Sequence, residues 1–200
     1  MQGLVDELPF GFGWLAPEHA FLQRTSHALA EAGRVWLIDP VDVEGLDERV
    51  GALGEPAGVI QLLDRHGRDC AALAERHRVP LHRVPFAGVP GSPFQVRAVV
   101  RLPGWREAAL WWPERRTLVV ADALGTAPYF LAPGERLGVH PLRRLAPPRA
   151  LRGLPAEHVL CGHGAGVHGP EAAAALEDAL RLARRRAPRW LAGLVRRRRG

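Results

Sequence analysis

The residues of this chain that could do chemistry follow predicted strands. Buried apolar runs predict these strands at residues 34–38, 59–63, 117–121 and 159–161. The candidates that come after them are Asp39, the segment 64–70, Asp122 and His163, together with Trp105 after a Pro103-Gly104 turn. Carboxylate, thiol and imidazole groups bind transition metals and transfer protons. Because strand ends meet at one edge of a layered sheet, we expect these side chains to share a site there.

The other elements must form the layers that carry this edge. Helical patterns cover residues 46–53, 70–77 and 170–186, and further strands are predicted at 21–29, 81–84, 94–102 and 108–112. Residues 1–18 are rich in Gly and Pro and are predicted to be irregular. Strands meet helices in both halves of the chain, which indicates an α/β sandwich. A length of 200 residues suits one such domain.

The order of these landmarks resembles the metallo-β-lactamase-like superfamily over about residues 20–185. That family has an early strand ending in Asp, an HxHxDH motif, a PGHT-like turn, a later strand ending in Asp, and a Gly-His-Gly turn. Their counterparts are Leu37-Ile38-Asp39, Arg65-His66-Gly67-Arg68-Asp69-Cys70, Pro103-Gly104-Trp105-Arg106, Val120-Ala121-Asp122 and Cys161-Gly162-His163-Gly164. The resemblance implies a four-layer αββα sandwich. We expect one such domain at residues 19–187, between the irregular segment 1–18 and an arginine-rich tail at 188–200.

One of the family's two metal sites is missing if the motifs align in this way. In the family, metal one is bound by the first two histidines of HxHxDH and by the histidine of PGHT. The residues at those positions here are Arg65, Gly67 and Trp105. A guanidinium stays protonated, glycine has no side chain and indole only donates, so none of them binds zinc. The chain is therefore expected to be a degenerate member of the superfamily.

The same resemblance implies that the second site keeps its ligands. Its positions hold Asp69, Cys70, Asp122 and His163, which supply carboxylate, thiolate and imidazole groups to one Zn or Fe ion. His66 lies one position out of register. An alignment shifted to include it would abandon Asp69 and Cys70 together, so no ligand role is assigned to it.

Each of these residues also has an ordinary structural explanation. Asp69 stands in the N-cap position of the predicted helix 70–77, and Asp122 is able to cap a turn. Cys70 and Cys161 suit a core as small apolar residues. His163 is harder to explain in this way, since the glycines on both sides let the backbone present its imidazole sharply.

The charge of the chain is concentrated at its C-terminal end. The net charge is +6, but nine arginines and no acid follow from residue 181 onward, and without them 18 basic residues face 21 acidic ones. Such a tail binds nucleic acid or other polyanions, or is simply a solvated helix end. Arg65 and Arg68 form a second cationic group, which suits a small anionic ligand or substrate.

These features predict a degenerate homologue with at most one metal and weak or no hydrolase activity. One alternative is an active mononuclear hydrolase of an ester, amide or phosphoester. The other is a non-enzymatic scaffold that binds an anion or nucleic acid. Two cysteines form no disulfide framework, and the sequence shows neither a signal peptide nor a membrane span, which predicts a cytoplasmic protein.

Overall fold

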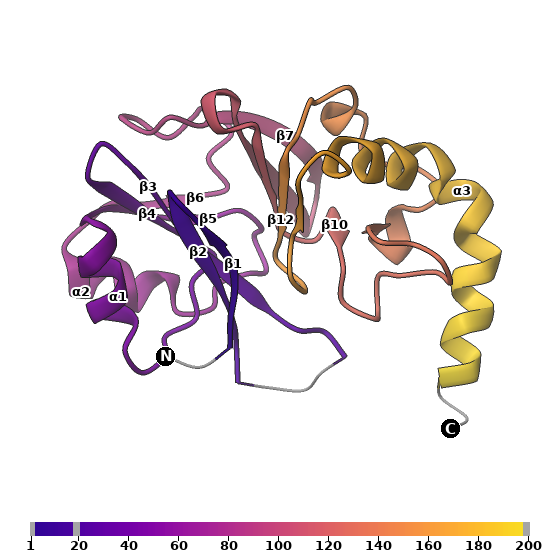
Figure 1. Ribbon diagram of the computed structural model, residues 1–200, viewed down its shortest axis with the longest axis horizontal. Helices are drawn as coiled ribbons and strands as arrows, with labels where there is room; N and C mark the ends of the chain where they lie inside the picture. Colours follow the sequence, from indigo (N-terminus) through magenta and orange to yellow (C-terminus); the bar gives the residue numbers. More distant parts are fainter. Residues whose placement is uncertain (1–2, 18–20, 198–200) are drawn as a thin grey trace.

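The computed structural model describes residues 3–17 and 21–197. Two β-sheets lie face to face, with α1 and α2 outside the first sheet and α3 outside the second (Figure 1). This arrangement confirms the α/β sandwich predicted from the sequence.

The first sheet has the strand order β1-β2-β3-β4-β5-β6. Its strands and the two helices beside them are β1 (Leu4–Leu8), β2 (Gly11–Leu15), β3 (Thr25–Glu31), β4 (Arg34–Ile38), α1 (Leu46–Leu53), β5 (Glu55–Gln61), α2 (Cys70–His77) and β6 (Leu81–Arg83). The last three strands are parallel, because α1 and α2 return the chain to the starting edge between them. Strands β4, β5 and β6 therefore all end at the same edge of the sheet.

The second sheet has the strand order β13-β12-β9-β8-β7. Its strands are β7 (Gln95–Leu102), β8 (Trp105–Trp112), β9 (Thr117–Val120), β12 (His158–Cys161) and β13 (Val167–His168), and α3 (Ala172–Arg197) follows. A small ladder of β10 (Leu124–Gly125) and β11 (Gly138–Val139) and the 3₁₀ turns η1 (Pro113–Arg115), η2 (Pro141–Arg143) and η3 (Arg149–Leu151) complete the chain. The parallel pairing of β9 with β12 brings a second pair of strand ends to one edge.

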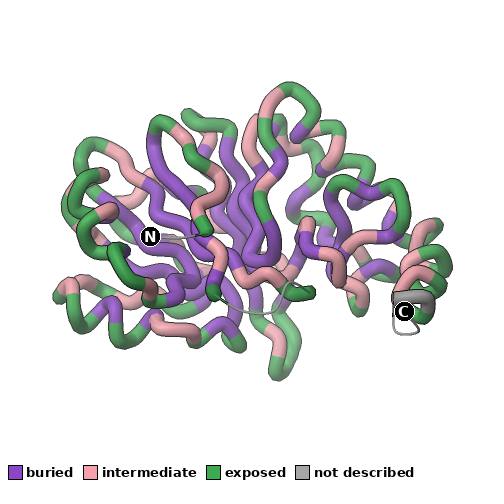
Figure 2. Tube along the Cα trace, turned by 60° about the horizontal axis from the view of Figure 1, so that its bottom comes forward, coloured by how far each residue is buried: buried purple, intermediate pink, exposed green. Residues whose placement is uncertain are grey.

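Three apolar clusters fill the spaces between the four layers. One lies between the first sheet and α1 and α2, one between the two sheets, and one between the second sheet and α3. Buried residues accordingly run along the central strands, whereas the outer turns are exposed (Figure 2). Strand β4 shows the consequence, because Val35, Trp36, Leu37 and Ile38 are all buried, as expected for a strand that is covered on both faces.

The N-terminal segment corrects the expectation that residues 1–18 are irregular. Residues 4–8 and 11–15 are strands β1 and β2 at the edge of the first sheet, and residues 1–2 and 18 lie outside the described residues. The glycines that suggested a loop permit close packing instead. A Cβ atom at Gly11 would lie 2.3 Å from the main-chain oxygen of Ala28 on β3, so a larger residue would force the two strands apart.

The C-terminal helix also differs from expectation, because it continues through Arg197 instead of ending near Arg186. Pro188 lies inside it, and Figure 1 shows α3 changing direction along its length. A proline removes one helical hydrogen bond and bends a helix without necessarily ending it. In the part of the chain that the structure describes, no helix combines the length and the apolar character needed to cross a membrane.

Candidate metal centre

Four loops that follow parallel strands bring the candidate side chains together. Asp39 comes directly after β4, His66 lies in the loop after β5, Asp122 follows β9, and His163 follows β12. The two sheets are tied at this edge by main-chain hydrogen bonds, among them Thr25 N–H to the oxygen of Gly162 at 2.8 Å. The site therefore lies where both sheets end on the same side.

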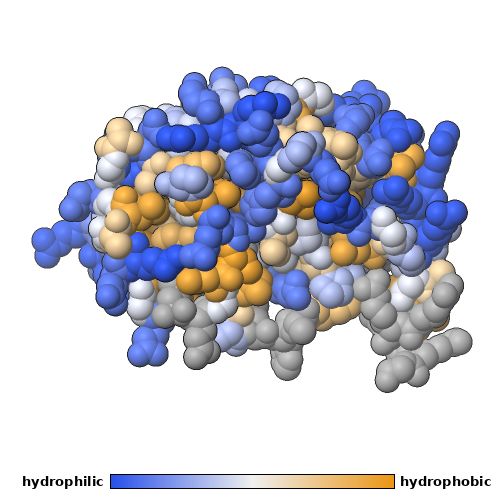
Figure 3. Space-filling model, in the orientation of Figure 1, coloured by the Kyte–Doolittle hydropathy of each residue, from blue (hydrophilic) through white to orange (hydrophobic). Residues whose placement is uncertain are grey.

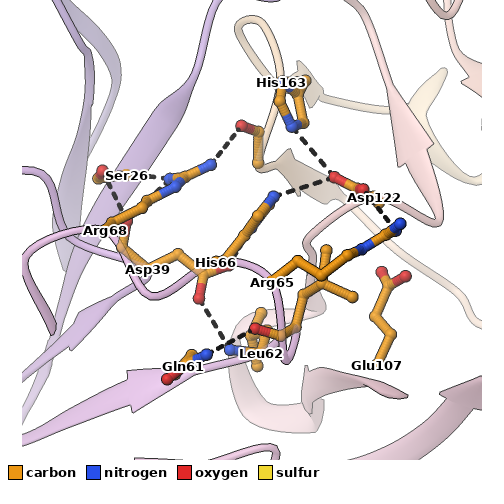
Figure 4. Close-up of polar contacts among 12 residues, drawn as sticks. Ser26, Asp39, Gln61, Leu62, Arg65, His66, Arg68, Glu107, Asp122 and His163 are labelled. Carbon is orange, nitrogen blue, oxygen red and sulfur yellow. Dashed lines mark hydrogen bonds and ion pairs between the residues drawn. The ribbon is translucent and has the colours of Figure 1, made fainter. Parts of the chain in front are cut away.

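His66 is held between two carboxylates (Figure 4). Its Nδ1 atom lies 2.9 Å from Oδ2 of Asp39, and its Nε2 atom lies 3.1 Å from Oδ1 of Asp122. Asp39 also accepts the N–H of Leu62 at 2.8 Å through Oδ1, which fixes the start of the loop that carries His66. A carboxylate accepts only, so Nδ1 donates to Asp39, and the Nε2 atom that faces Asp122 either carries a proton or offers its lone pair to a metal ion.

His163 reaches the same carboxylate from the second sheet. Its Nδ1 atom donates to the main-chain oxygen of Leu22 at 2.8 Å, and its Nε2 atom lies 3.0 Å from Oδ1 of Asp122. The ring also stacks on Phe130 with a centroid distance of 5.3 Å and an interplanar angle of 28°. Each imidazole is thus held by a hydrogen bond at Nδ1, and both Nε2 atoms face Oδ1 of Asp122.

Asp122 Oδ1 is the atom on which the two rings converge. It is buried, and no donor among the described residues is aligned with it for a hydrogen bond, although two imidazole nitrogens are within contact distance. One ligand atom from each of His66, Asp122 and His163 can be chosen so that all three lie within 4.8 Å of one another. Two imidazole nitrogens and a carboxylate oxygen facing one point, each ring held at its far nitrogen, fit a transition-metal ion. We call these three residues the triad.

The charges around the triad stabilise an ionised Asp122. Burial raises the pKa of this carboxyl, but the imidazoles of His163 and His66 outweigh burial and hold the pKa well below its usual range. For His66, burial and the charge of Arg68 lower the pKa, yet Asp39 and Asp122 together raise it above the ordinary value. Without a metal, His66 is therefore able to carry a proton that a metal ion would replace.

Known structures share this architecture over most of the chain. DIM-1 metallo-β-lactamase exposed to ceftazidime is 11% identical, with 90% of this chain and 98% of that chain covered at a TM-score of 0.53. FIM-1 from Pseudomonas aeruginosa in its mono-zinc form is 8% identical, with 90% and 95% covered at a TM-score of 0.55. A metallo-β-lactamase from Erythrobacter litoralis is 10% identical, with 89% and 91% covered at a TM-score of 0.52. This chain has the metallo-β-lactamase fold.

The likeness is one of fold, because the identities are low. No protein-family model and no curated protein sequence matches the chain. The metal-binding residues of this chain therefore follow from its own geometry.

Two residues of the predicted ligand set do not join the triad. Asp69 stands at the N-cap position of α2, and its Oδ2 atom accepts the N–H of Asp42 at 2.8 Å. Cys70 is buried in the apolar cluster beneath α2, where burial raises the pKa of its thiol to about 12. Of the expected set of Asp69, Cys70, Asp122 and His163, the structure thus brings Asp122 and His163 together with His66, whereas Asp69 caps α2 and Cys70 lies in the core beneath it.

Of the positions expected to lack metal ligands, Arg65 lies against the triad and Trp105 lies beside Arg65. Arg65 is half exposed, with its guanidinium 4.7 Å from the ring centre of Trp105 and 3.4 Å from Oδ2 of Asp122. Gly67 is exposed, with open space where a Cβ atom would stand. Trp105 packs edge-on against His140, whose pKa burial lowers to about 4. The indole of Trp105 thus lies between a buried histidine and Arg65, whose guanidinium is next to Asp122.

Arg68 has a structural role that the sequence did not reveal. Its Nη1 atom donates to the main-chain oxygens of Thr25 at 2.6 Å and Asp39 at 2.8 Å, and its Nη2 atom donates to that of Gly162 at 3.0 Å. These oxygens belong to three segments from both sheets. The expectation that Arg68 binds an anionic ligand is therefore corrected, because its terminal nitrogens are already used to join the two halves of the site.

Glu107 is a further site residue that sequence reasoning missed. It is fully buried on β8, and its Oε1 atom accepts the N–H of Ala123 at 2.7 Å, next to Asp122. Burial, with a smaller contribution from Asp122, raises the pKa of Glu107 to about 7. An acid directly before the apolar run Ala108 to Trp112 of the same strand was the signal available in the sequence. Glu107 positions the loop that carries Asp122.

Proposed function

We propose that this chain binds one divalent transition-metal ion through His66 Nε2, Asp122 Oδ1 and His163 Nε2. The observation that carries the proposal is the buried Asp122 Oδ1 atom, which lacks an aligned donor while two imidazoles face it. Three protein ligands leave a coordination position open, which is the pattern of catalytic rather than structural zinc sites. The mono-zinc form of FIM-1 shows that a protein of this fold is found with one zinc ion.

The chemistry that suits such a site is weak hydrolysis of an ester, amide or phosphoester. A bound metal would lower the pKa of a coordinated water. The chain itself contributes orientation: Asp39 and the Leu22 carbonyl hold the two imidazoles. Arg65, half exposed beside Asp122, is placed to bind an anionic group of the substrate. The nearby guanidinium of Arg65 also opposes a second cation, so one metal is expected.

Metal content tests the proposal directly. Protein purified without chelator and supplied with zinc should hold about one equivalent by elemental mass spectrometry, the stoichiometry of a mononuclear site. His66→Ala, Asp122→Asn and His163→Ala should each lose it. Asp69→Asn and Cys70→Ala serve as matched controls and should keep it, because both residues lie outside the triad. Metal lost in the controls but kept in His66→Ala would contradict this ligand set.

A second measurement separates the hydrolase from the scaffold. Zinc-loaded protein should cleave a chromogenic ester or phosphodiester slowly, and His163→Ala should not. Metal without activity on any substrate would leave a metal-binding scaffold. No metal even after zinc is added would leave the alternative that fits the same contacts, in which a protonated His66 bridges Asp39 and Asp122.

The remaining features concern location and partners. The two cysteines are free and buried, which supports a reducing compartment such as the cytoplasm. Nucleic-acid binding through the arginine-rich C-terminal segment stays a secondary proposal, to be tested by salt-dependent retention on a polyanion.

A further inference from the structure

A cavity of about 570 Å³ lies on the outer side of the second sheet, between α3 and the segment that links β11 to β12. Its volume falls in the range of pockets that bind small molecules. Five arginines line it, namely Arg143, Arg149, Arg152, Arg181 and Arg184. Hydrophilic side chains cover this upper right part of the molecule in Figure 3, over the first half of α3.

The positive charge of this cavity, here called the arginine pocket, is poorly balanced. Among the described residues, the structure records one acid in an ion pair with any of the five, which is Asp178 with Arg181 at 2.7 Å. The Nε atom of Arg143 is buried and has no hydrogen-bond partner in the part of the chain that the structure describes. A cleft lined by one sign of charge concentrates ions of the opposite sign, so the arrangement favours an anion in the pocket.

The loop and the helix hold the arginines in place. Arg184 donates from Nε to the main-chain oxygen of Leu145 at 2.7 Å, which anchors its guanidinium across the pocket. Arg149 belongs to the 3₁₀ turn η3, whose Leu151 is buried in the cluster beneath α3. Guanidinium groups that arrive from a helix and from a loop can approach one ligand from two sides. Planar guanidinium forks match phosphate oxygens in pairs.

The rest of the lining is apolar. Val99 from β7, Ala146, Pro147, Pro148 and Leu180 complete the wall. Such a wall accommodates the uncharged portion of an organic ligand, whereas a pocket for inorganic phosphate alone needs less space.

We propose that the arginine pocket binds a small organic ligand that carries two or more phosphate groups, such as a nucleoside diphosphate or triphosphate. The pocket is lined by none of the triad residues, so this inference is independent of the proposed metal centre. Arg143 closes the 3₁₀ turn η2, which starts directly after His140, the residue that packs on Trp105 near the triad, so the two sites share one connecting segment.

Calorimetric titration of the metal-stripped protein with ADP and with inorganic pyrophosphate tests the proposal, after all chelator has been removed by dialysis. Both probes should bind, adenosine should not, and added salt should weaken binding. Arg149→Gln combined with Arg152→Gln should weaken ADP binding by at least about ten-fold, since charge-assisted hydrogen bonds are lost. Both side chains are exposed, so the fold should survive, as circular dichroism would verify.

The controls make the outcome specific. Arg78→Gln combined with Arg83→Gln removes the same charge from exposed positions beside the first sheet and should leave ADP affinity unchanged. Asp122→Asn should also bind ADP normally, so failure of the metal proposal would not affect this result. Equal weakening in both arginine pairs would overturn the pocket in favour of diffuse attraction. Binding only to vesicles of anionic lipid, without ADP or pyrophosphate binding, would overturn it in favour of a membrane-facing surface.

Discussion

Asp39 and His66 are joined between Oδ2 and Nδ1 at 2.9 Å, and this contact determines which nitrogen of the imidazole faces Asp122. Asp39 is itself held after β4, where its N–H donates to the oxygen of Ile60 on β5 at 2.8 Å and its other carboxylate oxygen accepts from Leu62. A single carboxylate thus sets both the path of the loop and the tautomer of the ring. Residues that orient a ligand in this way influence metal affinity without touching the metal.

Asp39→Asn should weaken zinc binding by about 10- to 100-fold, the range seen when such supporting residues are changed. The asparagine oxygen still accepts from Leu62, but its NH₂ group faces Nδ1 and pushes the ring proton to Nε2. Competition with a chromophoric chelator measures the change. Asp64→Asn is the control from the same loop, because Asp64 is exposed and accepts the N–H of Arg106 instead. Equal affinity in the two variants would contradict an orienting role for Asp39.

Arg68 should be more important for stability than its neighbour Arg65. Arg68→Met removes the charge-assisted hydrogen bonds to the main-chain oxygens of Thr25, Asp39 and Gly162, which should cost at least about 2 kcal/mol. The oxygens of Asp39 and Gly162 keep one donor each, the Ser26 hydroxyl and the Thr25 N–H. Arg65→Met removes a half-exposed side chain and should stay within about 0.5 kcal/mol of the unchanged protein. Urea denaturation of the metal-free proteins compares the two. A smaller loss for Arg68→Met than for Arg65→Met would show that the hydrogen bonds of Arg68 add little to stability.

Glu107 should make the free energy of unfolding decrease as the pH rises from 4.5 to about 7. Burial raises its pKa from an ordinary value of 4.5 to about 7, so folding favours the protonated form. The stabilisation is complete below pH 4.5 and is lost as the pH rises through about 7, by roughly 3 kcal/mol in total. Glu107→Gln cannot ionise and should therefore gain stability relative to the unchanged protein between pH 5 and pH 8, as chemical denaturation at the two values would measure. A constant difference between the two proteins would mean that Glu107 titrates normally.

The second half of α3 should contribute to stability up to Trp190 and little beyond it. Trp190 donates from Nε1 to the main-chain oxygen of Tyr129 at 2.7 Å, and the two rings meet edge to face at 6.2 Å. A chain ending at Ala187 should melt at least about 2 °C lower, since about 1 kcal/mol corresponds to 2–4 °C at this size. A chain ending at Gly193 keeps Trp190 and should have the same melting temperature as the full-length protein. Equal melting of all three chains would show that this contact adds nothing.

The sequence by itself determined the layers and the strand ends. Continuous apolar runs such as Val35 to Ile38 suit only a strand that is covered on both faces, and the helix patterns at residues 46–53 and 70–77 agree with α1 and α2. Asp122 and His163 were identifiable because both follow such runs directly, and parallel strands must end at one edge. The landmarks therefore led to the right fold and to two members of the triad.

Only the tertiary structure decided which residue of the loop after β5 faces the site. A loop has no periodicity that assigns side chains to a face, and Asp39 and Arg68 both adopt positive φ angles, of 44° and 38°, that redirect the chain locally. His66 consequently points inward, whereas Cys70 joins the core beneath α2. An arginine that donates to buried carbonyls has the same sequence signature as one in solvent. The oxygens that accept from Arg68 belong to residues 25, 39 and 162. Because these residues are far from Arg68 along the chain, only the folded structure reveals its role.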